Sequence, residues 1–406
     1  MAVGDAFAFM VGEAKPVDDR ERVPLENATG RIMSRDARTT IALPPFDHSA
    51  IDGFGVSVAD VDRPPPHRLR VIGQVAAGGA AELRVSTGEA VRMFTGAAVP
   101  PGVAAIVLEE RCSLEGGRVR LNVAVPMAAN IRRRGEDVAA GSPIIEAPTI
   151  LDARHVAILA AAGLSEIEVR RRIRVVALST GDELRPGGGP LDPGSIYDSN
   201  RPMLGALLAR PWIETVHTQH VNDQVHALAE TLRKFARQAD VIITTGGAAG
   251  SDTDHTARAI VAAGGQASSL RLALRPGKPV VFGKIDHTLV LGLPGNPVAA
   301  MVNFLFFGRA LILGCAGLSV ERPRGQAALT ASPISHSPGR TEFAPARIVG
   351  FAKDGRPLIE KLGRGGSARL RPLVLADGLA EIPSDAADLG LGVPLSFHAF
   401  HTAFAP

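Results

Sequence analysis

The sequence is poor in aromatic residues. Phe, Trp and Tyr make up 4% of its 406 residues, with one Trp and one Tyr. Proteins that bind single-stranded nucleic acid stack the bases on such rings, so this composition argues against that function. The net charge of +3 is small for the length of the chain. It therefore gives no indication of a nucleic acid or a membrane surface as partner.

Cysteines and long apolar runs are also scarce. The two cysteines, Cys112 and Cys315, do not make a disulfide framework or a zinc site. No uninterrupted apolar run reaches about 18 residues, the length that predicts a membrane-spanning helix. The N-terminus lacks a basic segment followed by an apolar core. We therefore expect a cytoplasmic protein with no membrane partner.

The rest of the composition is that of a multidomain globular chain. Hydrophobic residues make up 46% and charged residues 21%. A length of 406 residues exceeds one ordinary core and predicts about two to four domains. Short β-like runs separated by Gly and Pro turns, from Ile41 to about Asp137, predict a small β-rich domain. Residues 322–406 have a similar texture and predict a second β-rich domain.

Three strand patterns dominate residues 173–320. The apolar runs RVVALS, ADVIIT and TLVLGL end in the glycine-containing loops TGDEL, TGGAAG and PGNP, and helix-like segments follow the second and third. Strands that alternate with helices predict a parallel sheet flanked by helices. In such open sheets, the loops at the carboxyl ends of the strands form the ligand crevice. We therefore expect the functional site at these loops.

The loop Thr244–Gly250 suits a phosphate, because glycines let backbone N–H groups approach an anion at a helix N-terminus. It is neither a P-loop nor a GxGxxG motif, so a plain strand-to-helix turn is the alternative. Acids cluster nearby: Asp182 and Glu183 follow the first strand, and Asp252 and Asp254 follow the glycines. Carboxylates beside a phosphate predict Mg²⁺, with helix capping by the two later aspartates as the alternative.

Cations and a polar loop complete the set of motifs. LRPGKP holds Arg275 and Lys278 on a proline-stiffened loop, which suits a tetrahedral oxyanion, although a solvated basic turn has the same pattern. The arginine-rich stretches NIRRRGED and GRGGSARLR leave the same two alternatives open. The stretch PPFDHSAIDGFGV, residues Pro44–Val56, is too rich in Pro, Gly and polar residues for an ordinary helix or central strand. Its adjacent Asp, His and Ser point in different directions, which argues against a catalytic triad.

Nine motifs in order, from about Asp36 to Pro383, resemble the molybdopterin molybdenumtransferase family, called MoeA in bacteria and related to the E domain of gephyrin. They are PPFDHSAIDGFGV, MFTGAAVP, NIRRRGEDV, STGDEL, YDSNRPML, TTGGAAGSDTD, PGKPVVFG, GLPGNPV and PGRTEF. The resemblance implies an elongated, dimeric chain of four domains. These are a split N-terminal linker and dimerisation domain (1–40 and 139–172), a β-rich inserted domain (41–138), an α/β molybdopterin-binding domain with a parallel sheet like that of molybdopterin adenylyltransferases (173–321), and a C-terminal β-barrel (322–406).

The activity that this resemblance implies is molybdenum insertion. Molybdate is transferred to adenylylated molybdopterin, the phosphoanhydride is hydrolysed with release of AMP, and Mg²⁺ assists. The resemblance also implies a homodimer, with molybdopterin adenylyltransferase and molybdoenzyme maturation proteins as further partners. The alternative is a divergent paralogue that binds or delivers molybdopterin or the finished cofactor without efficient insertion.

The resemblance also implies roles for individual residues, position by position. The catalytic set is Asp52, Thr95, Asp137, Glu183, Asp223 and Asp254. Asp52, Glu183 and Asp254 are the expected metal ligands, and the loop that carries Asp52 is expected to reach the crevice of the other subunit. The expected substrate-binding residues are Gly246, Gly247, Ser251, Pro294, Gly295 and Asn296. The expected molybdate-binding residues are Arg275, Lys278, Arg340 and Ser367.

The chain departs from the family pattern at several of these motifs. Ala249 and Ala299 stand where the family has serines, and Ser251 stands where it has a glycine. Arg275 replaces the usual Lys, which keeps the charge but changes a point charge into a planar fork. His48 replaces an Asn, and Phe54 replaces a Tyr. Each lost hydroxyl donor costs about 1–2 kcal/mol at an anion site, so molybdate binding is expected to weaken while the acids of the site remain.

Overall fold

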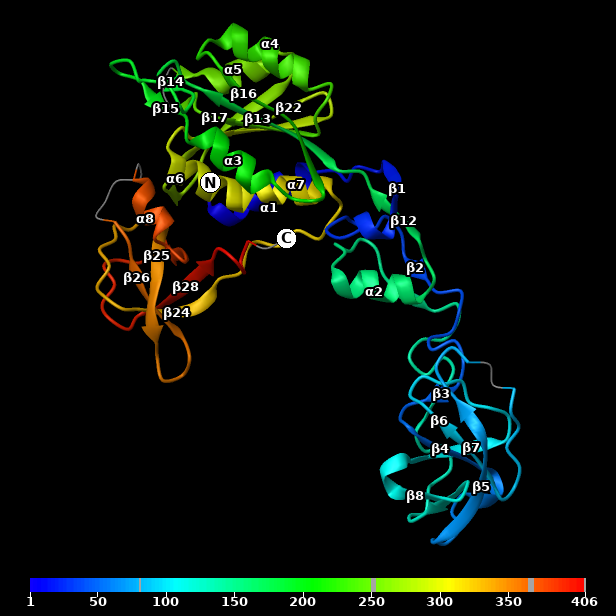
Figure 1. Ribbon diagram of the computed structural model, residues 1–406. Coiled ribbons are helices and arrows are strands. Elements are labelled where there is room, and N and C mark those ends of the chain that lie inside the picture. The colour runs from blue at the N-terminus through cyan, green and yellow to red at the C-terminus, as the bar shows by residue number, and fades with distance from the viewer. Residues whose placement is uncertain (80–81, 250–252, 364–368, 405–406) are drawn as a thin grey trace.

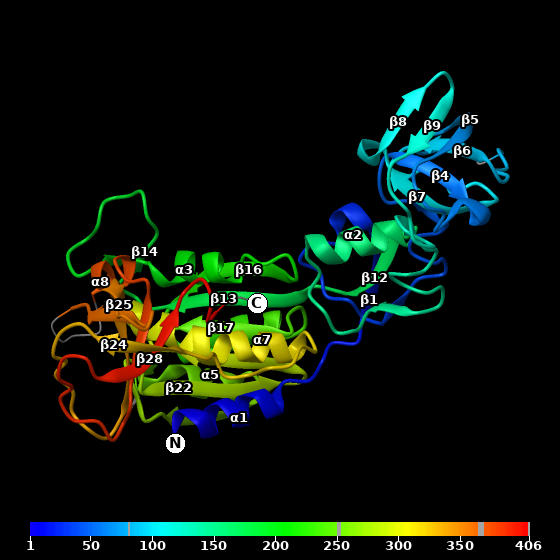
Figure 2. The ribbon, with the colours of Figure 1, turned by 90° about the horizontal axis from the view of Figure 1, so that it is seen from below.

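The computed structural model describes residues 1–79, 82–249, 253–363 and 369–404 of an extended molecule. A β-rich domain lies at one end of a slender segment, and an α/β domain with an adjoining barrel lies at the other end (Figures 1 and 2). This arrangement confirms the predicted fold class, which is an elongated chain with a central α/β domain, a β-rich insertion and a C-terminal barrel.

The α/β domain is built on a sheet of six strands in the order β16-β13-β17-β23-β22-β20. The first four run parallel, whereas β22 is antiparallel to β23 and β20 is antiparallel to β22. The three strands expected from the sequence are β13, β17 and β23, so the predicted parallel sheet is confirmed and has an antiparallel edge. The bounds are Ile213–Val221 (β16), Ile173–Thr180 (β13), Val241–Thr245 (β17), Thr288–Leu293 (β23), Pro279–Ile285 (β22) and Gln266–Arg271 (β20).

Helices cover both faces of this sheet, which explains why its central strands are apolar throughout rather than alternating. A hydrophobic cluster lies on each face of the sheet. One cluster contains residues of α1, α3, α6 and α7, and the other contains residues of α4 and α5. The domain also has two short strand pairs, β14–β15 and β18–β19. The bounds are Val3–Glu13 (α1), Asn200–Leu208 (α3), Val225–Phe235 (α4), His255–Ala262 (α5), Pro297–Asn303 (α6), Arg309–Cys315 (α7), Leu184–Arg185 (β14), Ile196–Tyr197 (β15), Ala248–Ala249 (β18) and Thr253–Asp254 (β19).

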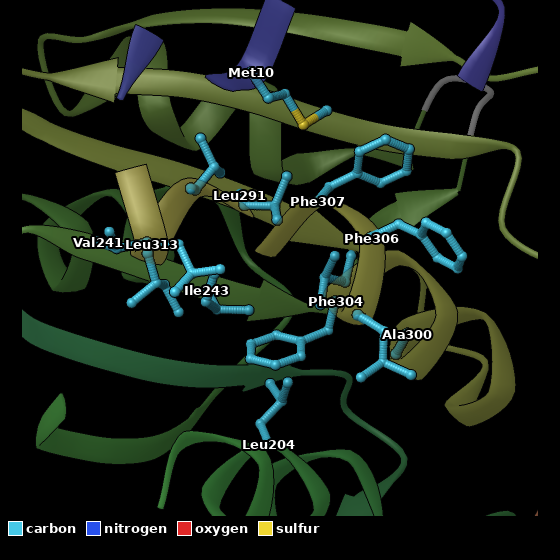
Figure 3. Close-up of a cluster of buried hydrophobic side chains, with 14 of the residues drawn as sticks. Met10, Leu204, Val241, Ile243, Leu291, Ala300, Phe304, Phe306, Phe307 and Leu313 are labelled. Atoms are coloured by element: carbon cyan, nitrogen blue, oxygen red, sulfur yellow. The ribbon is translucent and has the colours of Figure 1, made fainter. Parts of the chain in front are cut away.

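One helical segment is apolar enough to be compared with a membrane span. Residues Pro297–Cys315, 19 in all, join α6 and α7 through a π-helical turn at Phe304–Gly308, and their most apolar window has a mean hydropathy of 1.9. The uninterrupted apolar run is shorter because Asn303 and Arg309 interrupt it. The structure places 89% of the apolar window inside the protein. Figure 3 shows Phe304 and Phe307 of this segment among core side chains of the sheet and of α1 and α3.

The inserted β domain has a six-stranded sheet in the order β7-β4-β6-β5-β9-β8. Phe54 of β4 is 1% exposed and packs in its core with Val56 and Leu69. The replacement of the family's Tyr by Phe54 therefore changes a residue of the core of this domain. The bounds are Gly53–Ser57 (β4), His67–Val75 (β5), Glu89–Met93 (β6), Val103–Leu108 (β7), Cys112–Glu115 (β8), Arg118–Leu121 (β9), and His48–Ser49 (β3) paired with Ile131–Arg132 (β10).

Two segments that flank the inserted domain in sequence pair with each other in space. Strand β1 (Arg20–Pro24) is antiparallel to β12 (Glu166–Arg170), and β2 (Ala37–Arg38) is antiparallel to β11 (Pro143–Ile145). The helix α2 (Ala153–Ala161) begins with a capping box, in which Asp152 accepts hydrogen bonds from the backbone of the first turn. These pairings form the slender segment between the inserted domain and the α/β domain.

The C-terminal region is a closed barrel of five strands, in which β24 pairs with β26 and β28, and β25 pairs with β26 and β27, while β27 pairs with β28. Strand β21 (Leu274–Arg275) of the α/β domain pairs with the beginning of β25 and so ties the barrel to that domain. The bounds are Gln326–Thr330 (β24), Thr341–Phe351 (β25), Pro357–Lys361 (β26), Gly378–Ile382 (β27), Pro394–Ala399 (β28) and Leu370–Val374 (α8).

Aromatic packing also holds the barrel against the α/β domain. Phe306, in the π-helical turn, is 1% exposed. Its ring centroid lies 4.3 Å from that of Phe343 in β25, 5.4 Å from that of His398 in β28 and 5.6 Å from that of Phe404. Burial of this ring therefore links the two domains.

We predict that Phe306→Ala lowers the free energy of unfolding by about 3–5 kcal/mol, because it leaves a cavity where the two domains meet. Denaturant titration followed by circular dichroism measures the change. The matched control is Phe351→Ala, since Phe351 is 67% exposed on the same barrel and its truncation is expected to change stability by less than about 0.5 kcal/mol. Equal effects of the two substitutions would show that Phe306 does not join the domains.

Candidate functional site

The glycine loops after β17 and β23 meet at the carboxyl edge of the sheet. Gly246 has a φ of 91°, and a Cβ atom there would lie 2.1 Å from the carbonyl oxygen of Thr180. Gly247 also has a positive φ, of 63°. A Cβ atom on Gly295 would lie 3.6 Å from Cα of Gly246. The structure thus brings together three of the residues that the sequence analysis expected to bind substrate.

The loop that contains Gly295 is fixed by two asparagines. Asn296 caps α6, because its Oδ1 accepts hydrogen bonds from the backbone N–H groups of Val298 (3.0 Å) and Ala299 (3.2 Å). Asn200, at the beginning of α3, donates from Nδ2 to the carbonyl oxygen of Gly295 (2.7 Å). The sequence analysis quoted Asn200 within YDSNRPML but gave it no role, because its partner lies 95 residues away in the chain.

Buried hydroxyl groups lie at the same edge. Thr180 ends β13, and Thr244 and Thr245 end β17. All three are at most 3% exposed, and none of their Oγ1 atoms has a hydrogen-bond partner in the described parts of the chain. Buried polar atoms are normally paired with protein, water or ligand. These threonines, which the sequence analysis placed at the strand ends and in the loops that follow without giving them a role, are therefore candidates for contact with a bound molecule or ordered water.

Acidic residues surround the mouth of this crevice. Asp182 Oδ1 accepts a hydrogen bond from the backbone N–H of Asp223 (3.1 Å), which joins the loops after β13 and β16. Asp223 Oδ1 lies 2.9 Å from Nδ1 of His255, the first residue of α5. It also lies 3.6 Å from the position that a Cβ atom on Gly247 would occupy. Glu183 is exposed and directly follows Asp182 in the same loop.

Asp52, the predicted catalytic acid of the inserted domain, is surrounded by different residues from the acids of the α/β domain. Thr95 donates two hydrogen bonds to Oδ1 of Asp52, from its backbone N–H (2.7 Å) and its hydroxyl (2.8 Å). The backbone bond first, and then the hydroxyl bond, hold the pKa of Asp52 below its ordinary value. Asp52 is therefore an exposed, ionised carboxylate held in place by Thr95, another residue of the predicted catalytic set.

Other polar residues of Pro44–Val56 shape the loop that carries Asp52. Asp47 accepts hydrogen bonds from Nη1 of Arg133 (2.6 Å) and from the backbone N–H of Arg134 (2.8 Å). The backbone N–H of Asp137 donates to the carbonyl oxygen of Leu43 (3.1 Å). The arginine-rich stretch NIRRRGED is thus partly structural, and it places Asp137 beside the beginning of the loop.

A single chain does not bring the two groups of acids together. Strand β4, which follows Asp52, lies at the opposite end of the molecule from β14, which follows Glu183, in both views (Figures 1 and 2). Among the described residues, no group of three or more His, Cys, Asp or Glu could hold a metal ion. The side chain of Asp254 and all of Ser251 lie outside the described parts.

The predicted molybdate residues lie near the junction with the barrel. Arg275 ends β21, and its Nη1 is 3.9 Å from Oε2 of Glu342. Lys278 is exposed and Arg340 is half-buried beside the same strands, whereas Ser367 lies outside the described residues. Asn303 donates from Nδ2 to the carbonyl oxygens of Ala299 (2.8 Å) and Gly277 (3.3 Å). The serine that Ala299 replaces would therefore stand next to the LRPGKP loop.

Comparisons with known proteins agree with this architecture. Residues 1–163 match the MoeA N-terminal region (domains I and II), residues 176–313 match a probable molybdopterin-binding domain, and residues 327–399 match the MoeA C-terminal region (domain IV). A crystal structure of a molybdopterin biosynthesis MoeA protein from Pyrococcus horikoshii has a TM-score of 0.82 and 27% sequence identity, and the match covers 98% of this chain and 100% of that one. The fold and crevice thus define a multidomain protein of the molybdopterin-binding class.

Curated relatives define the family within that class. The chain is 35% identical over 399 residues to molybdopterin molybdenumtransferase 2 of Mycobacterium tuberculosis, with 96% of each chain covered. It is 30% identical over 383 residues to the molybdopterin molybdenumtransferase of Haemophilus influenzae, with 94% of each chain covered. The chain belongs to the molybdopterin molybdenumtransferase family and is an enzyme of that family.

We predict that Gly246→Ala lowers stability more than Gly264→Ala does. Both glycines have nearly the same φ, 91° and 94°, but a Cβ atom on Gly264 meets nothing within 4 Å. Gly264→Ala should therefore cost only the backbone strain of about 1–2 kcal/mol, whereas Gly246→Ala adds the clash with Thr180. Denaturant titration compares the two variants. Equal losses would show that the loop is not held tightly against β13.

Proposed function

We propose that this protein transfers molybdenum from molybdate to adenylylated molybdopterin, hydrolysing the phosphoanhydride and releasing AMP. The single observation that carries the proposal is the convergence of Gly246, Gly247 and Gly295 with the acids Glu183 and Asp223 at one edge of the sheet. Glycine backbones allow a phosphate to approach closely. The relatives described above are named molybdopterin molybdenumtransferases, a name that describes molybdenum transfer to molybdopterin.

The hydrolytic step needs a water molecule, an oriented phosphoanhydride and groups that manage protons. Water attacks one phosphorus atom, the P–O bond to the leaving phosphate breaks, and the water's protons pass to the two phosphate products or to solvent. The backbones of Gly246 and Gly247 would hold the phosphates, and Asp223 would orient His255 beside them. Molybdate, as the second substrate, would be held by Arg275, Lys278, Arg340 and Ser367.

We assign Asp52 to the crevice of a second copy of the chain, so that the working site belongs to a cytoplasmic homodimer. Two observations support this: β4, which follows Asp52, lies at the opposite end of the molecule from β14, which follows Glu183, and Asp52 is exposed and ionised rather than engaged in a buried ion pair. A symmetric dimer would build two such sites.

If Mg²⁺ takes part, Asp52, Glu183 and Asp254 are the expected ligands, but no step is assigned to the ion. An enzyme that adenylylates molybdopterin must supply the substrate, and molybdoenzymes must receive the product.

A second candidate function is binding or delivery of molybdopterin without efficient insertion. The buried Ala299 favours it, because the family's serine hydroxyl would lie beside the LRPGKP loop. One lost hydrogen bond of about 1.4 kcal/mol corresponds to about a tenfold weaker affinity. The insertase therefore predicts AMP release that rises with molybdate concentration, whereas the delivery protein predicts release at background even when molybdate is saturating.

The direct test uses the full-length protein with adenylylated molybdopterin, Mg²⁺ and molybdate, and measures AMP by chromatography. We expect Asp52→Ala to lower the rate by about 10²–10⁴-fold, the usual range for a lost acid or base. The matched control is Asp47→Ala, measured together with its thermal midpoint, because Asp47 holds the loop without being assigned to the site. AMP release at background in the unmodified protein, and no lower in Asp52→Ala, would reject the enzymatic proposal.

Subunit mixing tests whether the site is shared. Asp52→Ala and Glu183→Ala proteins, each inactive alone, are dissociated, mixed in equal amounts and reassociated. If one chain supplies Asp52 and the other Glu183, each mixed dimer regains one intact site, so about one quarter of normal activity returns. If both residues act within one chain, no intact site forms. Activity that stays at the level of the separate variants would therefore contradict the shared site.

A further inference from the structure

Arg92 and Glu109 form an ion pair across the end of β4 at which Asp52 lies. Arg92 is in β6, and its Nη2 donates to Oε1 of Glu109 (2.7 Å), which directly follows β7. In the sheet, β4 lies between β6 and β7. The two strands that carry the ion pair are therefore about 10 Å apart, twice the usual spacing of neighbouring strands. The sequence analysis gave neither residue a role, because they lie 17 positions apart in the chain.

Strand β4 is packed tightly between its neighbours at this end. Gly53, its first residue, pairs with Met93 of β6 and with Leu108 of β7. A Cβ atom on Gly53 would lie 2.1 Å from the carbonyl oxygen of Val107. Only a glycine therefore permits this approach. The position of Asp52, one residue before Gly53, thus depends on both neighbouring strands.

The segments that follow these two strands both hold Asp52. Thr95, just after β6, donates its backbone N–H and its hydroxyl to the Asp52 carboxylate. Glu109, just after β7, donates its backbone N–H to the Asp52 carbonyl oxygen (3.2 Å). Because Arg92 is in β6 and pairs with Glu109, its ion pair joins the two segments that hold Asp52.

The surroundings of Arg92 indicate a role other than stabilising the fold. The side chains of Arg92 and Glu109 are 36% and 42% exposed, and ion pairs in such contact with solvent contribute little to stability. The guanidinium carbon lies 5.2 Å from the centroid of the Phe94 ring. Nε is buried without a hydrogen-bond partner in the described parts of the chain, which adds a cost. The fold therefore gains little from Arg92, whereas Asp52 gains a fixed position.

We propose that Arg92 is a positioning residue for the reaction at Asp52. Through Glu109, it draws together the two segments that hold Asp52 and so fixes the direction in which the carboxylate leaves the inserted domain. The inference rests on the proposed function in one respect, which is that Asp52 takes part in the reaction. Arg92 needs no contact with the substrate for this role. A displacement of a reacting group by about 1 Å can lower a rate by about 100-fold, so loss of Arg92 should affect the rate more than the stability.

Hydrogen exchange tests the ion pair without any substrate. The full-length protein and its Arg92→Gln variant are compared by mass spectrometry, in the peptides that contain the amides of Thr95 and Glu109. Both amides donate to Asp52. In Arg92→Gln, they should exchange about two- to fivefold faster, the change expected for a lost exposed ion pair. Unchanged exchange at both amides would overturn the inference.

The matched control is Arg70→Gln, because Arg70 pairs with Glu89 at the other end of β6 and has no link to Asp52. It removes the same charge from the same sheet. It should leave the exchange of both amides and the rate of AMP release unchanged. Equal effects of Arg70→Gln and Arg92→Gln would contradict the positioning role, because both variants would then act only through the charge or stability of the domain.

Single-turnover AMP release, with the protein in excess over adenylylated molybdopterin, tests the role in the reaction. Arg92→Gln should lower the maximal rate by about 10- to 100-fold. The protein concentration that gives half the maximal rate should change by less than about twofold. Arg92→Lys keeps a cation for Glu109 and should recover most of the rate. Thermal midpoints check that each variant is folded.

A double variant separates positioning from an independent effect. If Arg92 acts through Asp52, Arg92→Gln should cause no further loss of rate in an Asp52→Ala protein. An equal loss in both backgrounds would overturn the inference. If the unmodified protein releases no AMP, the proposed function fails, and the exchange measurement still decides whether Arg92 holds Asp52 in place.

Discussion

The close approach of two glycine loops across neighbouring parallel strands is the constraint on which the site depends. Gly246 lies against the carbonyl oxygen of Thr180 and beside Gly295, where any side chain would collide with backbone. This contact holds the ends of β13, β17 and β23 at one edge, where the hydroxyls of Thr180, Thr244 and Thr245 are buried without a partner in the described parts of the chain. The helices that bury both faces of the sheet keep these strand ends in register.

Polar residues in the loops divide into those that build the site and those that hold it. Asp47 and Asn296 both accept hydrogen bonds from backbone N–H groups, and Asp47 also pairs with Arg133. Asp52 is instead exposed, and Thr95 keeps it ionised. This state of Asp52, on a domain set apart from the α/β domain of its own chain, is the reason for proposing that Asp52 acts on another subunit.

The barrel supplies residues to its junction with the α/β domain. Pairing of β21 with β25 places Arg275 beside Glu342, and the ring of Phe306 fixes the same junction from the core. The charged pocket at this junction contains His336 and Lys361, which come from segments with no strong motif. The pocket at this junction is therefore built by residues of both domains.

The sequence determined the fold class, because apolar runs followed by glycine loops repeat three times and each run is long enough for a buried strand. It also pointed to the loops that contain Gly246, Gly247 and Gly295, because a glycine-containing turn after an apolar strand is visible in the local sequence. Only the tertiary structure decided which polar residues meet: Asn200 reaches Gly295, and His336 pairs with Glu342 and opens into a pocket with Arg275. Such contacts join distant segments through strand register and domain packing, and no local pattern of residues encodes those distances.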